Sequence, residues 1–195
     1  MSWHTVQLAD SAPQAWKNGG GITRELLAWP SADDWHIRLS VADITANGPF
    51  STFVEVQRWF AVLQGDGVCL TVEGTPTHLH TNSPAFCFSG GASTTCKLLG
   101  GHTRDFNLML RGVTGQLQRI QGQAAGRLTG FRAQDNMKMI AVYAIGEKTN
   151  VRFDQDVCRL EPGTLAWRLL DNSALSAHAN WSVQADNALW MEISP

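Results

Sequence analysis

The chain has 195 residues, of which 44% are hydrophobic and only 16% are charged, and its formal net charge is −2. A nucleic-acid-binding protein needs a basic surface, so this charge argues against nucleic acid as a main partner. Four cysteines without a C-x-x-C spacing indicate reduced thiols rather than disulfides or a zinc site. The N-terminus lacks the features of a signal peptide, and no apolar stretch is long enough for a membrane helix. The sequence therefore predicts a soluble, cytoplasmic protein.

Short runs of alternating polar and apolar residues recur along the chain, each ended by Gly, Pro, Asn or Asp. The clearest runs lie at residues 35–42, 56–63, 68–73, 105–111, 138–145 and 165–170. Many short strands with closely spaced turns are typical of an all-β sandwich or barrel. The G-D-G sequence at Gly65–Gly67 predicts a hairpin between two of these strands.

A mild change in composition near residues 122–130 divides the chain into two halves. We expect an N-terminal barrel over residues 1–122, which carries the ligand site, and a C-terminal barrel over residues 123–195. Neither half is large enough to bury a sufficient hydrophobic core alone, so we expect the two halves to pack together. The sequence leaves open whether strands are exchanged between the halves.

Four arginines lie in strand-like stretches: Arg24, Arg38, Arg58 and Arg111. Because side chains alternate between the two faces of a strand, Arg58 shares its face with Phe60 and Val62. By the same rule Arg24 shares its face with Leu26. A guanidinium stays protonated, and burying it unpaired is costly. Each buried arginine therefore needs a partner, either a carboxylate of the protein or an anionic ligand.

The stretch from Trp16 to Glu25, W-K-N-G-G-G-I-T-R-E, joins three glycines to a cluster of polar residues. A phosphate-binding Walker loop places its lysine after the glycines and before a helix, so the order here is wrong for that motif. A glycine-rich turn that needs positive φ or a close backbone approach is the simpler interpretation. It leaves the polar cluster unexplained, which comprises Asn18, Thr23, Arg24 and Glu25.

In the stretch D-F-N-L-M-L-R, the side chains of Asp105, Asn107, Met109 and Arg111 share one face. Taken alone, this pattern favours a half-exposed strand with its polar side in solvent. Inside a barrel that holds a ligand, the polar face would instead be the inner one.

Two histidines at i and i+2, His78 and His80, point the same way and have a geometry that suits a metal ion. No Asp, Glu or His follows them before His102, so an exposed pair of histidines is the favoured interpretation. No nucleophile elbow or activated cysteine is evident.

Taken together, these motifs resemble the HutD/Ves family. The matching residues are Trp16, Asn18, Gly19, Gly20, Gly21, Thr23, Arg24, Glu25, Arg38, Ser40, the G-P-F-S-x-F stretch at 48–53, Arg58 and the D-F-N-x-M-x-R stretch at 105–111. One departure is V-E-V-Q at residues 54–57, where the family usually has a Pro-Gly turn.

The resemblance implies a bicupin, with two cupin-type barrels in one chain. Ordinary cupins hold a metal with H-x-H, a glutamate and a later histidine, whereas this family is not known for a metal centre, so we expect no metal and no cofactor. The HutD branch accompanies histidine-degrading enzymes, where a role in tuning the pathway is proposed, and the Ves branch is linked to cold and stress responses.

The leading hypothesis is a non-catalytic protein that binds a small carboxylate inside the N-terminal barrel. Arg58 and Arg111 would clamp the carboxylate with bidentate hydrogen bonds. By family resemblance, the candidate ligands are formylglutamate and urocanate. The full set of predicted ligand-binding residues is Asn18, Thr23, Arg24, Glu25, Arg38, Arg58, Asp105, Asn107 and Arg111.

Two alternatives stay open. The first is a metal-independent isomerase or hydrolase that uses Glu25 and Asp105. The second is an interaction protein whose arginines are paired internally with Glu25, Asp105 and Glu55. The sequence does not decide whether the chain forms a homodimer.

Overall fold

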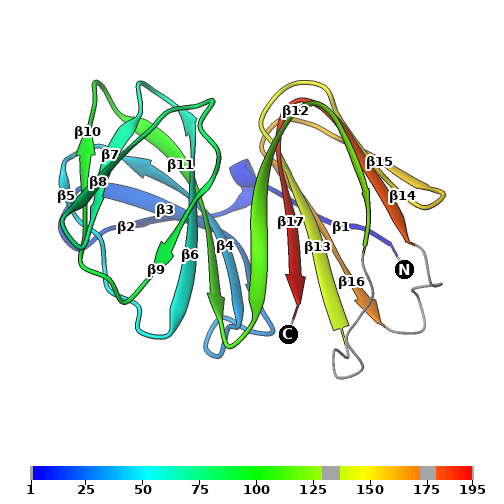
Figure 1. Ribbon diagram of the computed structural model, residues 1–195, viewed down its shortest axis with the longest axis horizontal. Helices are drawn as coiled ribbons and strands as arrows, with labels where there is room; N and C mark the ends of the chain where they lie inside the picture. The colour runs from blue at the N-terminus through cyan, green and yellow to red at the C-terminus, as the bar shows by residue number, and fades with distance from the viewer. Residues whose placement is uncertain (1, 129–136, 172–178, 195) are drawn as a thin grey trace. The chain divides into compact units, whose positions relative to one another are not determined.

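The computed structural model describes residues 2–128, 137–171 and 179–194, and Figure 1 traces the strands through this part of the chain. The chain forms two compact units. We call residues 11–112 the N-terminal unit, and residues 1–10 together with 113–195 the C-terminal unit. The boundary that we expected at residue 122 falls inside a strand, and the assignment of domains stays a prediction.

The N-terminal unit consists of two antiparallel sheets. The larger sheet has the strand order β2 (Pro13–Ala15), β3 (Gly21–Trp29), β4 (Ile37–Ile44), β11 (Thr103–Arg111), β6 (Val56–Gln64) and β9 (Phe86–Ser89). The smaller sheet has the order β5 (Gly48–Pro49), β10 (Thr94–Leu98), β7 (Val68–Val72) and β8 (Thr75–Leu79).

An apolar cluster joins these two sheets. Phe60 and Val62 of β6 contribute to it from the larger sheet, and Val68 and Leu70 of β7 from the smaller one. These pairs are two residues apart, as expected for a strand that turns every second side chain toward the core. Arg58 precedes Phe60 by the same step and is likewise buried, with 7% of its surface exposed. The predicted burial of Arg58 is therefore confirmed.

The central strands β4 and β11 are buried on both faces. Leu108 of β11 is completely buried on one face, and Asp105 and Asn107 are 0% and 7% exposed on the other. The half-exposed strand that the sequence of β11 favoured is therefore wrong. Its polar residues face the interior of the unit, as they would in a fold that encloses a polar site.

Two turns show what the glycines do. Gly19 has a φ of 70°, and a Cβ atom on Gly21 would lie 2.5 Å from the carbonyl oxygen of Asp43. Both the left-handed conformation and the close approach that the sequence suggested for this turn are therefore present. At Gly65–Gly67 the chain also turns, with φ of 97° and 105° at the two glycines. The flanking strands β6 and β7 belong to different sheets, so the predicted hairpin is wrong there.

The C-terminal unit is built on one antiparallel sheet. Its strand order is β1 (His4–Gln7), β16 (Thr164–Asp171), β13 (Met137–Ala144), β17 (Asn180–Ser194), β14 (Thr149–Phe153) and β15 (Asp156–Leu160), and β12 (Thr114–Arg127) also pairs with β17. A short 3-10 helix, η1 (Leu8–Asp10), follows β1. The core of this unit includes Ile140, Val183 and the stacked rings of Trp181 and Trp190.

The all-β class predicted from the sequence is confirmed throughout the described residues. The four cysteines are free, and only Cys96 is fully buried. Within the described ranges, no helix is long and apolar enough to cross a membrane.

Candidate functional site

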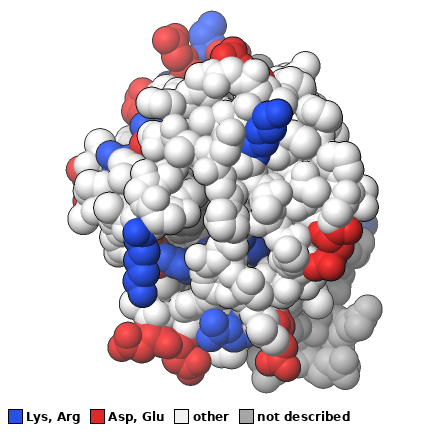
Figure 2. Space-filling model, turned by 90° about the vertical axis from the view of Figure 1, so that its left-hand side faces the viewer, with Lys and Arg blue, Asp and Glu red and all other residues white. Residues whose placement is uncertain are grey.

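A cavity of about 670 Å³ lies in the N-terminal unit, over the larger sheet. Strands β3, β4, β6 and β11 supply Thr23, Arg38, Ser40, Ala42, Ile44, Arg58, Phe60, Asn107 and Met109. The remainder of the lining comes from residues 14–18 and from Pro49, Phe50, Ser51 and Phe53. On the face of the molecule seen in Figure 2, charged side chains are scattered over a largely uncharged surface.

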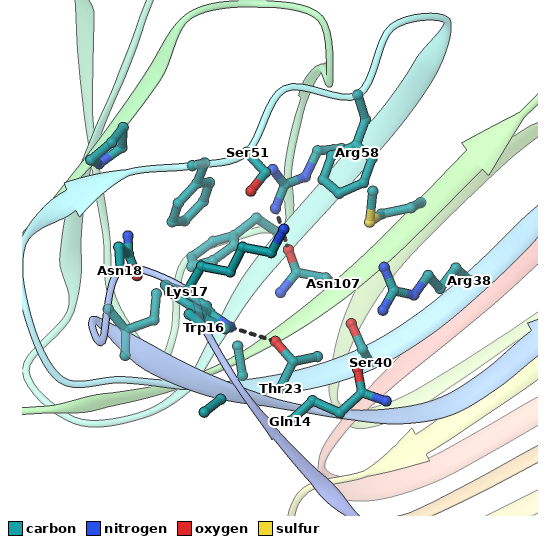
Figure 3. Close-up of a pocket in the computed structure, with 18 residues that line it drawn as sticks. Gln14, Trp16, Lys17, Asn18, Thr23, Arg38, Ser40, Ser51, Arg58 and Asn107 are labelled. Carbon is teal, nitrogen blue, oxygen red and sulfur yellow. Dashed lines mark hydrogen bonds between the residues drawn. The ribbon is translucent and has the colours of Figure 1, made fainter. Parts of the chain in front are cut away.

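The register of three strands places two arginines on one face of the sheet. Met109 of β11 lies opposite Arg38 of β4 on one side and opposite Arg58 of β6 on the other. All three side chains therefore form one row across the sheet. Figure 3 shows the guanidinium groups of Arg38 and Arg58, together with the amine of Lys17, directed toward the same space.

Arg58 is held in the cavity wall by neutral groups. Its Nη2 donates a hydrogen bond of 2.8 Å to Oδ1 of Asn107, and Nε has no partner among the described residues. The guanidinium carbon lies 4.9, 5.9 and 5.1 Å from the ring centroids of Phe50, Phe53 and Phe88. Burial, and then the nearby charge of Arg38, lower the pKa of Arg58 to about 10, so it stays charged at neutral pH.

Arg38 has a carboxylate partner outside the lining of the cavity. Its Nε donates a 2.6 Å hydrogen bond to Oε2 of Glu25, and both side chains are about a quarter exposed. One edge of the Arg38 guanidinium is therefore fixed by Glu25, while its terminal nitrogens face the cavity.

Three neutral residues complete the polar lining at the end formed by the Trp16–Glu25 stretch. The indole Nε1 of Trp16 donates a 2.7 Å hydrogen bond to Oγ1 of Thr23. The backbone N–H of Gly20 donates a 3.0 Å hydrogen bond to Oδ1 of Asn18. The glycine turn thus fixes Asn18, and Trp16 fixes Thr23, whereas Arg24 and Glu25 of the same stretch have partners on β4.

Of the nine predicted ligand-binding residues, five line the cavity: Asn18, Thr23, Arg38, Arg58 and Asn107. Arg24 lies outside it and donates a 2.9 Å hydrogen bond to Asp43, which also pairs with Arg104 at 2.6 Å. The guanidinium of Arg111 packs 4.2 Å over the ring of Trp35 and does not line the cavity.

The two predicted carboxylates also lie outside the cavity lining. Glu25 is bound to Arg38, as described above. Asp105 is completely buried, and its Oδ2 accepts a 2.8 Å hydrogen bond from the hydroxyl of Thr103. Its other oxygen, Oδ1, has no partner among the described residues. Burial raises the pKa of Asp105 to about 8.

Several lining residues were missed from the sequence, among them Lys17 and the aromatic residues Phe50 and Phe53. Lys17 was set aside because its glycines did not match a phosphate loop. Phe50 and Phe53 belong to the G-P-F-S-x-F stretch that carried the family resemblance. The match of that stretch to the family was the available signal for this wall of the site.

A model of the HutD family matches residues 8–191, which is most of the chain. This chain belongs to the HutD family. An uncharacterized 21.2 kDa protein in the hutC 3′ region of Pseudomonas putida is 50% identical over 106 residues, which are 53% of this chain and 56% of that protein. This comparison therefore spans little more than half the length of the relative.

Solved structures agree with this family assignment. HutD from Pseudomonas fluorescens matches with a TM-score of 0.81 and 26% identity over 100% of both chains. Salicylate 1,2-dioxygenase from Pseudoaminobacter salicylatoxidans matches with a TM-score of 0.59 over 99% of this chain and 82% of that one. At 8% identity the second likeness concerns the fold alone, and it supports the expected cupin-like all-β architecture.

The cavity of this HutD-family chain does not fit the metal set of ordinary cupins. Its described lining contains no imidazole and no carboxylate, and three cations would repel a metal ion. His78 and His80 are not among the lining residues, and Nδ1 of His80 lies 2.9 Å from the carbonyl oxygen of Asp66. In the described ranges no group of three or more His, Cys, Asp or Glu gathers at one point.

The departure from the family at residues 54–57 preserves a turn. Glu55 has a φ of 60°, so it adopts the left-handed conformation that a glycine would adopt more readily. Phe53 N–H donates to the carbonyl oxygen of Gly90, and Gly90 N–H donates to that of Val56, each at 2.7 Å. The turn is therefore tied on both sides to the glycine beside β9, and Phe53 stays in the cavity wall.

Proposed function

We propose that this chain is a bicupin that binds a small carboxylate in the cavity of its N-terminal unit. As a non-catalytic member of the HutD family, it tunes histidine catabolism through that ligand. Formylglutamate and urocanate are the candidate ligands. Support for the pathway comes from the family and from the name of the Pseudomonas putida relative, which places that protein in a hutC region.

The observation that carries the proposal is the state of Arg58. Arg24 and Arg38 each have a carboxylate of the protein beside them, at 2.9 and 2.6 Å. Among the described residues Arg58 has none within salt-bridge distance, although only 7% of its surface is exposed. A buried guanidinium without a counter-charge is costly, and a ligand carboxylate supplies both the charge and two acceptor oxygens. Arg38 and Lys17 add positive charge on the same side.

The two alternatives have less support. An enzyme that used Glu25 and Asp105 would need them at the cavity, whereas neither lines it. An interaction protein with internally paired arginines would need partners for all of them. That pattern holds for Arg24 and Arg38 but not for Arg58 within the described part of the chain.

Thermal unfolding with and without each candidate acid tests the proposal. At a hundredfold excess over Kd, a ligand that binds only the folded state stabilises it by about 2.7 kcal/mol. We expect a clear rise in Tm with formylglutamate or urocanate. Neutral amide analogues should give much less, because they cannot form the charge-assisted pair. NMR of the mixture over time should show the ligand unchanged, and turnover would refute the non-catalytic role.

Arg58→Met and Arg111→Met form a matched pair of variants. Arg58 has no carboxylate partner among the described residues, so its replacement leaves no opposite charge unpaired. The free energy of unfolding of Arg58→Met without ligand should therefore stay within about 1 kcal/mol of the parent or exceed it. The same variant should lose the ligand-induced rise in Tm. Arg111→Met, which lies outside the cavity, should keep it. No shift with any acid in the parent protein would contradict the proposal.

A further inference from the structure

Three neutral side chains in the cavity each accept a hydrogen bond from the protein. Oδ1 of Asn107 accepts from Arg58, Oδ1 of Asn18 accepts from the N–H of Gly20, and Oγ1 of Thr23 accepts from Trp16. In each case the donor is an N–H group that can only donate, so the orientation of both amides is fixed. Each internal hydrogen bond uses one lone pair of an oxygen atom and uses none of the N–H and O–H groups of these three side chains, which are left for a ligand.

What these residues offer to a ligand is a set of donors. Asn107 and Asn18 keep their NH₂ groups, and the hydroxyl proton of Thr23 is directed away from the indole that donates to it. Arg38, Arg58 and Lys17 are donors with no acceptor at all. The remaining side-chain acceptors in the lining are neutral: the hydroxyls of Ser40 and Ser51 and the amide of Gln14.

The charges of the lining point the same way. Three cations and no carboxylate occur among the described lining residues, and Glu25, beside Arg38, is already in an ion pair at 2.6 Å. A ligand ammonium group would meet repulsion from these cations and would find no anionic acceptor. A ligand carboxylate meets the opposite conditions, because all of its lone pairs accept.

We propose that the cavity selects acids without an ammonium group over the matching α-amino acids. This inference rests on the proposed function, since it assumes that the cavity binds small carboxylates. In chemical terms, the ligand is an acid whose parent amine has been removed by a deamination or masked by an acylation. The free amino acid that enters such a reaction sequence would not occupy the site.

Isothermal titration calorimetry with three dicarboxylates tests this selectivity. Glutarate and glutamate have the same carbon chain and differ by the ammonium group, while in N-acetylglutamate the amine is acylated and uncharged. We expect glutamate to bind at least tenfold more weakly than glutarate, and N-acetylglutamate to recover binding relative to glutamate. Equal affinity for glutarate and glutamate would overturn the selectivity while the proposed function stands. If no carboxylate binds at all, the proposed function fails and the selectivity falls with it.

Changing one amide of the cavity lining to a carboxylate should weaken the preference for glutarate over glutamate. Asn107→Asp keeps an oxygen for Arg58 but adds an anionic acceptor, so the glutarate-to-glutamate affinity ratio should fall at least threefold. Asn47→Asp is the matched control: Asn47 lies outside the lining, and its Oδ1 accepts from the N–H of Leu98 at 2.7 Å. This control should leave the ratio unchanged. If Asn107→Asp does not fold, Gln14→Glu replaces it, because Gln14 lines the cavity at an exposed position. An unchanged glutarate-to-glutamate affinity ratio in whichever variant folds would overturn the inference.

Discussion

The carboxyl group of Asp105 lies on the same face of β11 as Asn107, with no exposed surface and with one oxygen that has no partner in the described part of the chain. Burial is the largest influence on the pKa of this carboxyl group, the hydroxyl of Thr103 lowers that pKa and the carboxylate of Asp43 raises it. Neither group is a cation, and the pKa of Asp105 is raised to about 8. Asp105 is thus expected to be mostly neutral in the folded protein at pH 7.

This state of Asp105 predicts how stability changes with pH. Between about pH 4 and pH 8 the unfolded chain releases a proton that the folded chain keeps, so the folded state loses stability as pH rises. The slope for one proton is at most about 1.4 kcal/mol per pH unit. We expect Asp105→Asn to remove this component, so that its free energy of unfolding relative to the parent increases from pH 5 to pH 7. Urea unfolding at each pH measures this, and parallel profiles for the two proteins would contradict it.

At the scale of single residues, the sequence could predict that Arg58 is buried but not which arginines have partners. Alternation along β6 was sufficient for Arg58. For Arg24 the deciding partner, Asp43, lies 19 positions away and is brought close by the register of β3 against β4. That register includes an irregularity between Glu25 and Leu27, which alternation alone cannot anticipate.

At the scale of elements, strands were predictable because each carries its own alternating pattern, whereas their partners were not. The turn at Gly65–Gly67 was recognisable from its glycines. Whether the next strand pairs with the previous one or enters another sheet depends on contacts made elsewhere in the fold. Here β7 pairs with β8 and β10. One such departure, between β4 and β6, supplies a wall of the cavity: Pro49 of β5 in the smaller sheet and Phe50, Ser51 and Phe53 after it.

Substitution of Gly90 tests whether the turn before β6 shapes the cavity wall. A Cβ atom there would lie 2.8 Å from the carbonyl oxygen of Phe53 and 2.9 Å from that of Val56, and hydrogen bonds to Gly90 tie both residues to the turn before β6. We expect Gly90→Ala to destabilise by on the order of 2 kcal/mol, because overpacking displaces the backbone, and to weaken acid binding through Phe53.

Gly91→Ala supplies the control for that substitution. At Gly91 an added Cβ atom has no described neighbour closer than 3.6 Å, so the free energy of unfolding and the affinity should change little. Chemical unfolding and calorimetric titration of both variants make the comparison. Equal effects at the two glycines would show that the tie to Phe53 does not shape the site.

At the scale of the whole molecule, the sequence indicated two halves but not that the first ten residues belong with residues 113–195. β1 pairs with β16 over four residues, and the N–H of Leu8 donates to the carbonyl oxygen of Gly163 at 2.9 Å. Pairing across some 160 positions leaves no local trace, because a strand at a sheet edge carries the same alternation whichever strand it joins.

The N-terminal residues also complete the surroundings of a second buried arginine. Arg168 of β16 is 5% exposed and lies 5.6 Å from the ring centroid of Trp3 and 4.8 Å from that of Phe153. Its carboxylate partner is Asp156, at 2.9 Å. Unlike Arg58, this arginine has a counter-charge within the protein. The C-terminal unit has a cavity of about 480 Å³, lined by residues of β12, β14, β15 and β17, and Arg168 does not line it. We therefore regard Arg168 as structural.

Trp3→Ala should accordingly destabilise the C-terminal unit. Trp3 is half-buried against that unit's core, so its removal should cost about 2 kcal/mol through lost apolar contact and a less covered guanidinium. His4→Ala is the control, because the exposed side chain of His4 stacks on Trp167 with ring centroids 4.5 Å apart; its cost should stay below about 1 kcal/mol.

Hydrogen exchange should show that amides of β13 and β16 lose protection in Trp3→Ala while those of β4 and β11 keep theirs, because a local loss of contacts opens one cooperative unit before the other. Equal loss of protection in both sets of strands would mean that the two units unfold as one.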